Sequence, residues 1–579
     1  MEAGPTEASK SETSRRLLRL WPGVAIVVLQ WLVWQGVPRI IPGTRAGYIS
    51  AFGVLVGALL FVLWWVFFSR ARWKERLGAI ALMAAALIAT RQFLHESVAT
   101  GGMGFLYFVY SIPFLCLAFV LWAVLARRTR GRARWVSLVA VVLAATAAWT
   151  LIRMDGTRGS GADFAWRWSP TPEERLLATT GAEPVAGGAR APVMEVEIEW
   201  PGFRGPERDG VVRGVRIETD WASSPPVELW RRSVGPGWSS FAIRGDFLYT
   251  QEQRGDDEVV SCYRLDTGEP VWMRAEPVRF WEANAGAGPR ATPTLSRGRV
   301  VALGATGILT ALDATDGALV WSRDATADTG AKLPVWGFSG SPLVVEDVVV
   351  VAASGSLAAY DLETGAPRWQ GPAGGEGYSS PQLMTLDGVA QVVQISGDGA
   401  VGVSPADGRR LWEHAWAGYP IVQPAVTSDG DLLVSVTAQS GLRRLALAGG
   451  PGEWTVEERW TSNGLKPYFN DFVVHEGHAY GFDGNILASI DLEDGRRVWK
   501  GGRYGNGQLV LLADQDLLLV LSETGELALV GATPDRFREI ARFDVFDSKT
   551  WNHPVLIGDL LLLRNDREMA AFRLEHAEK

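Results

Sequence analysis

Cysteine and histidine are scarce in this sequence: its 579 residues include two cysteines and six histidines. Cys116 lies in an apolar segment and Cys262 in an expected strand, so we expect no disulfide between them. No CxxC pair and no CxxCH haem motif occurs. Because zinc and other transition-metal sites draw heavily on these residue types, the composition argues against a metal enzyme, and we predict no metal site.

Catalytic signatures are missing as well, since the sequence has no GxSxG, no P-loop and no HExxH motif. The stretch HEGH at 475–478 pairs two histidines with a glutamate, but it stands between the apolar runs FVV and AYGF. We therefore interpret Glu476 and Gly477 as a hairpin turn flanked by the two histidines, with no third metal ligand in sight. We predict no catalytic residue.

Basic residues are under-represented after residue 155. Residues 1–155 carry a net charge of +11, whereas the rest of the chain carries −19. An acidic domain lacks the clustered Lys and Arg that phosphate backbones require, so we expect no nucleic-acid partner. A basic N-terminal part followed by an acidic remainder is typical of a membrane domain that precedes a soluble one.

The first part of the chain contains five apolar stretches, each near the roughly 20 residues that a helix needs to cross a bilayer. They lie at about 17–37, 47–68, 77–94, 104–126 and 135–152. The first has no small-residue cleavage site, so we interpret it as an anchor and not as a signal peptide.

Positive charges gather at alternate ends of these stretches, at RRLLR before the first, at 70–76 after the second and at 127–134 after the fourth. By the positive-inside rule the N-terminus is cytoplasmic, and five spans place the rest of the chain outside. We predict a multi-pass protein of the cytoplasmic (inner) membrane with a periplasmic or extracytoplasmic C-terminal domain, in contact with the lipid bilayer through five helices.

Residues 155–200 are rich in Gly, Ala, Pro and Glu and have no periodicity. Within them SPTPEERLL predicts a short helix, with Thr171 as its N-cap and Pro172 at its first position. The predicted domains are therefore a membrane domain at 1–153, an extracytoplasmic linker with a short helix at 154–199, and a third domain at 200–579.

A repeat fills the third domain. Stretches such as CYRLDTGEPVW (262–272) and ALDATDGALVW (311–321) combine an apolar run, Asp, Gly and a closing Trp. Intervals between successive closing residues run from 39 to 49, and the closing residues are Trp230, Trp272, Trp321, Trp369, Trp412, Trp460, Trp499 and Phe543. Units of this length made of four short strands predict a β-propeller.

The recurring motif has a physical explanation. A tight hairpin between the last two strands needs a residue at positive φ, which Gly supplies, and the Asp side chain can accept hydrogen bonds from the turn amides. Trp then follows on the outermost strand, where its ring can pack on the adjacent blade and its N–H can reach a carbonyl.

The number of blades follows from the last unit, HPVLIGDLLLLRNDREMAAFRLEHA, which has three strands and no closing Trp. PVELWRRSV, which contains Trp230, precedes the first full unit and can supply the fourth strand. We predict an all-β propeller of eight four-stranded antiparallel blades closed by this strand, preceded by five transmembrane helices. Seven blades with a stray hairpin is the alternative.

LDTGEPVW (265–272) and LETGAPRW (362–369) resemble the pyrroloquinoline-quinone (PQQ)-type propeller repeat. That repeat occurs in quinoprotein dehydrogenases and in the non-catalytic propeller lipoprotein of the outer-membrane barrel-assembly machine. WPGFRGPERDGV (200–211), YGFDG (480–484) and TWNHPVLIGDLLLLRN (550–565) resemble a large set of bacterial extracytoplasmic proteins with this repeat. The resemblance covers roughly 200–575 and implies the fold more strongly than a function.

The dehydrogenase members of this family imply features that are absent here. Soluble alcohol dehydrogenases place a vicinal disulfide over the cofactor, and this sequence has no CysCys pair. Their Ca²⁺ ligands, Glu, Asn and Asp, find no assignable positions, and the short repeat units leave little room for the insertions that build an active site. We therefore expect no cofactor. The alternative is a membrane-bound quinoprotein dehydrogenase that oxidises a sugar or alcohol and reduces membrane quinone, and only this alternative implies PQQ and Ca²⁺.

The loop that leads into each innermost strand carries a bulky aromatic in nearly every unit. These loops emerge on one face around the axis, so we predict that their side chains line a funnel for a ligand or peptide. The alternative is that the aromatics wedge between blades. The predicted ligand-binding residues are Trp238, Arg290, Trp336, Tyr378, Tyr419, Lys466, Tyr468, Asn470, Arg503, Tyr504, Asn506, Lys549, Trp551 and Asn552.

The sequence thus predicts a membrane-anchored propeller that acts as a binding or scaffold module for an envelope protein or a small ligand on its funnel face. A purely structural role, in which the propeller only docks other envelope proteins, is a third hypothesis.

Overall fold

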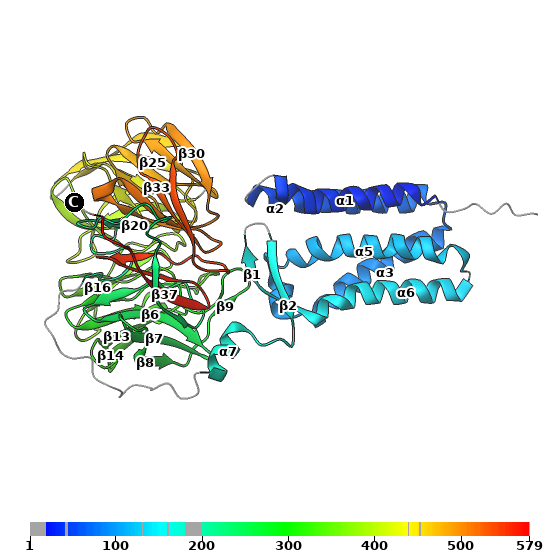
Figure 1. The fold of residues 1–579 in the computed structure, drawn as a ribbon, viewed down its shortest axis with the longest axis horizontal. Helices are drawn as coiled ribbons and strands as arrows, with labels where there is room; N and C mark the ends of the chain where they lie inside the picture. Colours follow the sequence, from blue (N-terminus) through cyan, green and yellow to red (C-terminus); the bar gives the residue numbers. More distant parts are fainter. Residues whose placement is uncertain are drawn as a thin grey trace, which may run out of the picture. The chain divides into compact units, whose positions relative to one another are not determined.

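A computed structural model of the chain describes residues 19–577 except 41–43, 130, 159–160, 180–198, 438 and 451–452. The chain divides into two compact units, Met1–Ser169 and Pro170–Lys579 (Figure 1). The domain boundaries expected at 153/154 and 199/200 remain a prediction.

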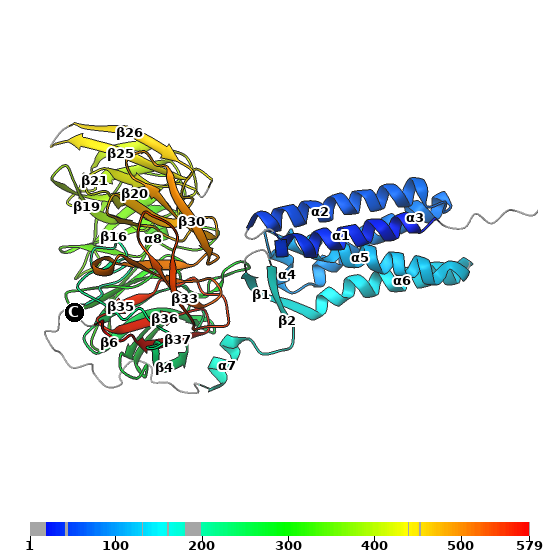
Figure 2. The same cartoon turned by 45° about the horizontal axis from the view of Figure 1, so that its top comes forward.

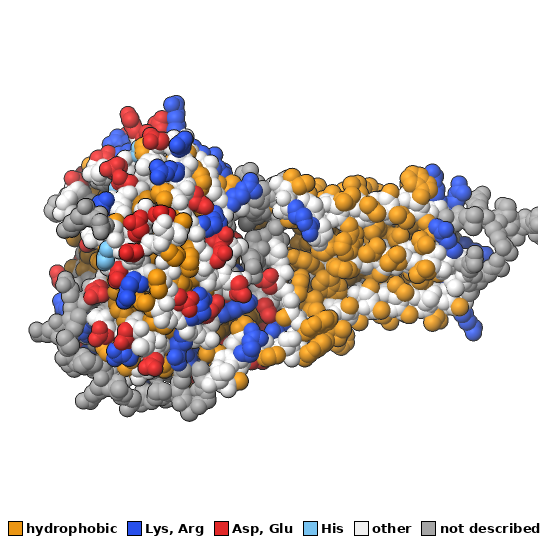
Figure 3. Space-filling view, in the orientation of Figure 1, with side chains coloured by type: hydrophobic (Ala, Val, Ile, Leu, Met, Phe, Trp, Pro, Cys, Tyr) orange, Lys and Arg blue, Asp and Glu red, His pale blue; other side chains and the backbone are white. Residues whose placement is uncertain are grey.

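The first unit is helical. Its main helices are α1 (Trp21–Ile40), α2 (Thr44–Leu63) continued by the π-helical turn η1 (Trp64–Phe68), α3 (Trp73–Thr90), α5 (Leu106–Leu125) and α6 (Gly131–Ala147), with a short α4 (Glu96–Thr100). Among the described residues, five segments are long and apolar enough to span a membrane, as predicted: Trp21–Ile40, Ala46–Phe68, Trp73–Phe93, Leu106–Leu125 and Gly131–Leu151. Their visible surface is a continuous apolar band, with Lys and Arg near the ends (Figure 3).

A β-hairpin that the sequence did not predict follows the last helix. It consists of β1 (Ile152–Arg158) and β2 (Gly161–Trp166), and Phe164 packs edge-on against Trp149 and Tyr110 at centroid distances of 5.9 and 5.2 Å. A register shift between Met154 and Gly156 breaks the period-two pattern by which a strand is recognised.

The predicted short helix is α7 (Pro172–Thr179), in the second unit. The Glu174 N–H donates to Thr171 Oγ1 at 3.0 Å and the Thr171 N–H donates to Glu174 Oε2 at 2.6 Å, which is a capping box. An ion pair of 2.8 Å between Glu173 and Arg279 attaches α7 to the propeller.

The rest of the second unit is an eight-bladed propeller of four-stranded antiparallel sheets, as predicted (Figures 1 and 2). Blades one to four are β5–β8 (Ala242–Arg244, Phe247–Arg254, Asp257–Arg264, Pro270–Glu276), β11–β14 (Thr294–Ser296, Arg299–Leu303, Ile308–Asp313, Leu319–Asp324), β15–β18 (Leu343–Val345, Val348–Ala353, Ser356–Asp361, Pro367–Gln370) and β19–β22 (Gln382–Leu386, Val389–Ser396, Gly399–Val403, Arg410–Ala415).

Blades five to seven are β23–β26 (Ala425–Val426, Leu432–Val434, Leu442–Gly449, Trp454–Ser462), β27–β30 (Val473–His475, His478–Asp483, Ile486–Asp491, Arg497–Arg503) and β31–β34 (Gln508–Leu512, Leu517–Leu521, Glu526–Gly531, Glu539–Asp544). Blade seven also carries a fifth strand, β3 (Val211–Val212), and a small separate hairpin is formed by β9 (Trp281–Glu282) and β10 (Gly286–Ala287).

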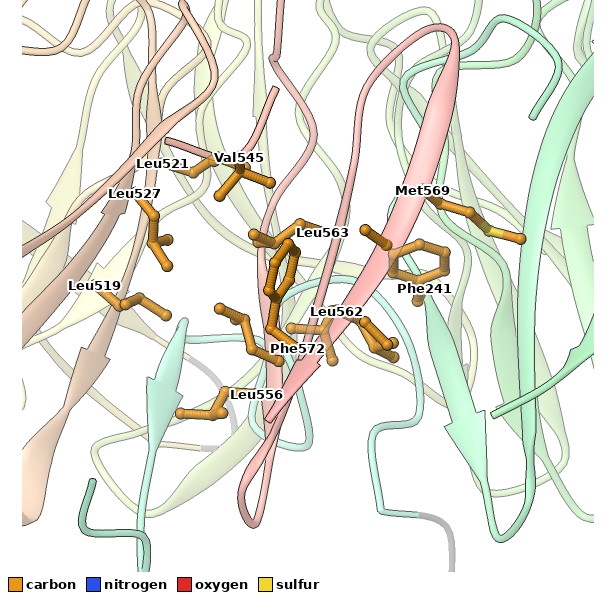
Figure 4. Packing of buried hydrophobic residues seen from close by; sticks show 14 of the residues in the cluster. Phe241, Leu519, Leu521, Leu527, Val545, Leu556, Leu562, Leu563, Met569 and Phe572 are labelled. Atoms are coloured by element: carbon orange, nitrogen blue, oxygen red, sulfur yellow. The ribbon is translucent and has the colours of Figure 1, made fainter. Parts of the chain in front are cut away.

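Blade eight closes the ring. Its strands are β35 (Val555–Ile557), β36 (Leu560–Arg564), β37 (Glu568–Arg573) and, from the other end of the domain, β4 (Val227–Ser233), in which Trp230 pairs with Ala571. The alternative of seven blades is therefore wrong. In the core at this closure, Leu562 and Phe572 lie between the leucines of blade seven and Phe241 of blade one (Figure 4).

The closing tryptophans join each blade to the next. In six of them the indole N–H donates to a carbonyl of the following blade: Trp230 to Leu265 (2.9 Å), Trp272 to Ala314 (3.2 Å), Trp321 to Leu362 (2.8 Å), Trp369 to Pro405 (3.0 Å), Trp460 to Leu492 (3.0 Å) and Trp499 to Thr533 (2.8 Å). The predicted packing of Trp on the adjacent blade is therefore confirmed.

Two junctions differ. Trp412 donates to Gln391 of its own blade, because blade five replaces the tight turn with the long β25–β26 hairpin seen at one edge of Figure 2. The Phe543 side chain has no N–H to donate, and its ring packs edge-on against that of Phe572 at a centroid distance of 5.9 Å.

Replacing Gly317 by Ala tests this contact. Gly317 has φ of +72° and an added Cβ would lie 2.5 Å from the Trp272 ring, whereas Gly298 of the same blade has φ of +75° and open space around it. We expect Gly317→Ala to lower the free energy of unfolding by about 1–3 kcal/mol more than Gly298→Ala, because only the first change displaces the indole. Thermal unfolding of the detergent-solubilised full chain measures this, and equal losses would contradict the contact.

Candidate functional site

The innermost strands are linked around the axis by hydrogen bonds from the backbone of one blade to a side chain of the next. The donors and acceptors precede the first strand of each blade: Ser240 N–H to Thr292 Oγ1 (2.9 Å), Thr292 to Ser341 Oγ (2.9 Å), Ser341 to Ser380 Oγ (2.9 Å), Ser380 to Gln423 Oε1 (2.8 Å) and Gln423 to Asp471 Oδ1 (2.7 Å). Ser240 Oγ also donates to the His553 carbonyl of blade eight at 2.7 Å. We call this arrangement the axial ring.

Residues 200–212, which we call the axial segment, cross the centre of this ring. Trp200 pairs with Ile243 of blade one, and Arg208 donates to the Ser341 and Pro342 carbonyls of blade three at 3.1 and 2.9 Å. At its end, Val211 pairs in parallel with Leu511 of blade seven. A segment this short can reach blades so far apart in the ring only on the axis, so it occupies the central channel.

The axial segment brings buried charge into the channel. Arg204 lies 3.6 Å from Asp471, with side chains 3% and 4% exposed, and donates to the Phe472 carbonyl at 2.8 Å. Phe203 packs edge-on against His553 at 4.9 Å. Burial lowers the pKa of His553 to about 3, helped by the charge of Arg204, so this imidazole is neutral at pH 7.

Arg208 is compensated differently. It donates to carbonyl oxygens and forms no ion pair with a carboxylate among the described residues. Burial, with the nearby charge of Arg204, lowers the pKa of Arg208 to about 10. The guanidinium therefore remains protonated at pH 7 and is stabilised by backbone dipoles.

Aromatic side chains from the loops that lead into the innermost strands form a belt on the funnel face. Its centroid distances are 4.8 Å for Trp238–Trp551, 4.8 Å for Trp551–Phe469, 5.2 Å for Phe469–Tyr468, 6.5 Å for Tyr468–Trp336 and 5.1 Å for Trp336–Tyr378. Trp336 belongs to blade three and Tyr468 to blade six, so the rings meet across the face.

Lys549 lies beneath this belt. Its Nζ is 4.1 Å from the Trp551 centroid and 5.1 Å from that of Trp238, and it donates to the Asn284 carbonyl at 2.8 Å. Burial lowers the pKa of Lys549 to about 8. The two indole faces partly replace the water that this cation loses.

Glu523 links Lys549's aromatic neighbours to the blade-seven loop. Its carboxylate accepts from Trp551 Nε1 at 3.0 Å and from the backbone and side-chain nitrogens of Asn506, both at 3.2 Å.

Arg290 stacks on Phe280 at 4.9 Å, pairs with Glu282 at 3.4 Å and donates to the Trp336 carbonyl at 3.3 Å. The belt is therefore fastened from below by charged side chains.

Apart from Tyr504, the predicted site residues fall into three groups. The structure brings together six in and under the belt, Trp238, Trp336, Tyr378, Tyr468, Lys549 and Trp551, with Arg290 and Asn506 bonded to this group. Asn470 and Asn552 are fully buried beside the axial ring, whereas Lys466 is half-buried and Tyr419 and Arg503 are exposed. Their role in binding a ligand remains a prediction.

Tyr504 is placed differently. It is 1% exposed in the core between blades six and seven, and its hydroxyl hydrogen-bonds to Glu539 at 2.5 Å. This aromatic wedges between blades, which is the alternative that the sequence left open, because Gly502 beside it lets the chain turn inward and the ring covers the apolar strand edges.

Sequence reasoning missed Phe203, Arg204, Arg208, Phe469 and Asp471. Arg204 and Arg208 belong to WPGFRGPERDGV, and two arginines in a stretch otherwise rich in turn residues could have indicated a role for this segment. Asp471 occupies the same repeat position as Ser240, Thr292, Ser341, Ser380 and Gln423, so an internal alignment of the units would have found it.

The propeller domain is similar to known proteins. The family model described as outer membrane protein assembly factor BamB matches residues 256–501. Over these residues the propeller is similar to that family. BamB of Shewanella oneidensis is 26% identical over 377 residues, which is 58% of this chain and 86% of that protein, and BamB of Yersinia pestis is 24% identical over 320 residues, or 52% and 70%.

Solved structures similar to this chain include BamB from Moraxella catarrhalis, with a TM-score of 0.45 and 15% identity over 60% of this chain and 100% of that one. Quinohemoprotein alcohol dehydrogenase from Comamonas testosteroni gives a TM-score of 0.49 and 13% identity over 70% and 85%.

The pair of Arg204 and Asp471 can be tested by removing its charges. Arg204→Met leaves a buried carboxylate without its guanidinium, so we expect a loss of about 3–5 kcal/mol in the free energy of unfolding. The double variant Arg204→Met with Asp471→Asn should recover part of this loss. Arg213→Met, whose side chain is 58% exposed, is the control, and thermal unfolding is the measurement. A single variant as stable as this control would show that the pair does not hold the axial segment.

The pH dependence of stability tests the buried Lys549. Its pKa is lower in the folded state than the ordinary 10.5, so the unfolded chain binds its proton more tightly between pH 8 and 10.5. Folding is therefore penalised below pH 8, and the penalty of about 3 kcal/mol is relieved as pH rises through this window. We expect Lys549→Met to lack this gain.

The measurement compares thermal unfolding of the wild type and of Lys549→Met from pH 7 to 10.5. Lys466→Met removes a half-buried lysine from the same face and serves as the control. If the stability of the wild type and that of Lys549→Met changed equally with pH, Lys549 would not be buried between the indole rings as described.

Proposed function

We propose that this protein is a membrane-anchored binding module of the bacterial envelope that recruits a protein partner through the funnel face of its propeller. The observation that carries this proposal is the aromatic belt together with large apolar side chains exposed on the same loops. Leu333 is 50%, Val335 69%, Tyr419 60% and Tyr468 39% exposed. Exposed aromatic and aliphatic side chains grouped on one face are typical of protein-binding sites.

The positive charges on the funnel face favour a partner with acidic residues. Lys332, Lys466 and Arg503 occur on the same set of loops, while the rest of the domain is acidic. Cations around an apolar centre favour a partner segment that combines apolar and acidic residues. The relatives are named for outer membrane protein assembly, which also supports a protein partner.

The five apolar helices support an inner-membrane location with a cytoplasmic N-terminus and a periplasmic propeller. Basic residues at 70–76 and 127–134 flank the ends of the second and fourth segments that would face the cytoplasm.

The dehydrogenase alternative requires oxygen ligands for Ca²⁺ and space on the axis for a quinone. Asp471, the carboxylate of the axial ring, already pairs with Arg204 and accepts from the Gln423 N–H at 2.7 Å. The axial segment occupies the channel beside it. These residues do not fit the cofactor, so we propose no redox step and no catalytic residue.

Cross-linking in cells tests the proposal. A photoreactive residue at Val335 of the full-length chain should capture a defined envelope protein. Tyr419→Ser with Tyr468→Ser should reduce its recovery at least tenfold, because truncating two exposed aromatics of this face removes much of the apolar contact.

Leu319→Ser is the matched control, since Leu319 is 40% exposed on the outermost strand β14. Equal capture by the double variant and by this control would contradict a funnel-face partner. Stoichiometric quinone absorbance with dye reduction, after addition of PQQ and Ca²⁺ to the purified protein, would support the dehydrogenase instead.

A further inference from the structure

Two turns from neighbouring blades meet on the propeller face opposite the funnel. One is the Glu476–Gly477 turn between β27 and β28 of blade six, which confirms the hairpin that the sequence predicted at HEGH. The other joins β31 to β32 of blade seven and ends at Asp516. His475 Nε2 lies 2.7 Å from Asp516 Oδ1, and ligand atoms of His475, Glu476 and Asp516 all lie within 4.8 Å of one another.

Both turns are held by their own blades. The Gly477 carbonyl accepts from the Leu492 N–H at 2.9 Å, and the Asp516 carbonyl accepts from the Ala532 N–H at 2.7 Å. The chain just after β3 fastens the second turn, because the Ile217 N–H donates to Gln515 Oε1 at 2.7 Å. The backbone therefore sets the separation of the three side chains before any ligand binds.

The local charge is negative. Among the described residues, neither Glu476 nor Asp516 pairs with a lysine or an arginine, and His475 is the one ion-pair partner of the Asp516 carboxylate. Burial raises the pKa of the Tyr480 hydroxyl nearby, and the charges of Glu476 and Asp516 add to this effect. Two carboxylates and one imidazole thus face a shared point with at most one compensating positive charge.

We propose that His475, Glu476 and Asp516 bind one divalent transition-metal ion of the Zn²⁺ class. One imidazole nitrogen and two carboxylate oxygens are ligands that Zn²⁺ accepts at about 2.0–2.2 Å, which requires ligand atoms about 3.3 Å apart. The present spacing of up to 4.8 Å would have to close by side-chain rotation when an ion binds. Three protein ligands leave a fourth position for water.

The second histidine of HEGH is not part of this site. His478 Nδ1 contacts the Glu476 carbonyl at 2.9 Å and lies outside the group of three. The sequence near HEGH shows no third ligand because Asp516, the third member of the group, comes from the next blade. A bound ion would clamp blade six to blade seven, where β3 joins the ring.

Zinc binding to the full-length chain in detergent tests this proposal after removal of metals with a chelator. Isothermal titration should give a site that His475→Ala and Asp516→Asn each weaken at least tenfold, and Glu476→Gln should weaken it as well. His478→Ala is the matched control, since it removes a histidine from the same turn without touching the site, and it should bind zinc as the wild type does.

Thermal unfolding supplies the second readout. Zinc should raise the Tm of the wild type and of His478→Ala but not that of His475→Ala, since an ion that binds the folded state stabilises it. Metal-free Tm values of the variants close to that of the wild type establish that they fold. Zinc affinity that is the same in the wild type and in His475→Ala would show that His475 and Asp516 form an ion pair only, and would overturn the proposal.

Discussion

The contact between a closing tryptophan and the turn of the next blade sets the spacing at most junctions of this propeller. An indole ring can lie flat on the following blade only if the turn beneath it has no side chain, and that turn also needs a left-handed residue. Gly317 meets both requirements below Trp272, with the indole N–H bonded to the Ala314 carbonyl at 3.2 Å. A Trp–Gly pair of this kind therefore sets the spacing between sheets at five of the eight junctions, and the last blade becomes four-stranded once β4 with Trp230 joins it.

The centre of the ring follows from a second constraint. Closing eight sheets leaves polar backbone groups around an axial channel, and buried polar groups must find partners. The axial ring satisfies one set of amides through Ser, Thr, Gln and Asp side chains, and Arg204 and Arg208 satisfy several carbonyls. Because the axial segment fills the channel and the aromatic belt lies over it, the funnel face offers a surface for a partner more readily than a deep pocket for a cofactor.

Much of the fold could be predicted from the sequence because its determinants recur within each unit. The regular interval between closing residues, the Gly turns and the three-stranded last unit predicted eight blades and their closure by PVELWRRSV. Apolar length predicted the five helices. The β1–β2 hairpin escaped prediction because a bulge interrupts its alternation and its stability comes from Trp149 and Tyr110 on the helices.

The candidate site could be predicted only in part. The sequence placed aromatics on the loops of one face, since every innermost strand begins there, but could not tell which rings converge. Trp336 and Tyr468 meet across the face, whereas Tyr504 turns into the core, although each is an aromatic in a loop that leads into an innermost strand.

What the sequence by itself determined is therefore local and periodic: the strands, the turns, the spans and the order of the blades. Only the tertiary structure decided what lies on the axis and between blades, because the partners there belong to different repeat units and are far apart in the chain. Arg204 finds Asp471 and Val211 finds Leu511 through the closure of the ring, and His475 finds Asp516 through the stacking of two blades. Such pairs carry no periodicity, so the packing of whole sheets against one another is what brings them together.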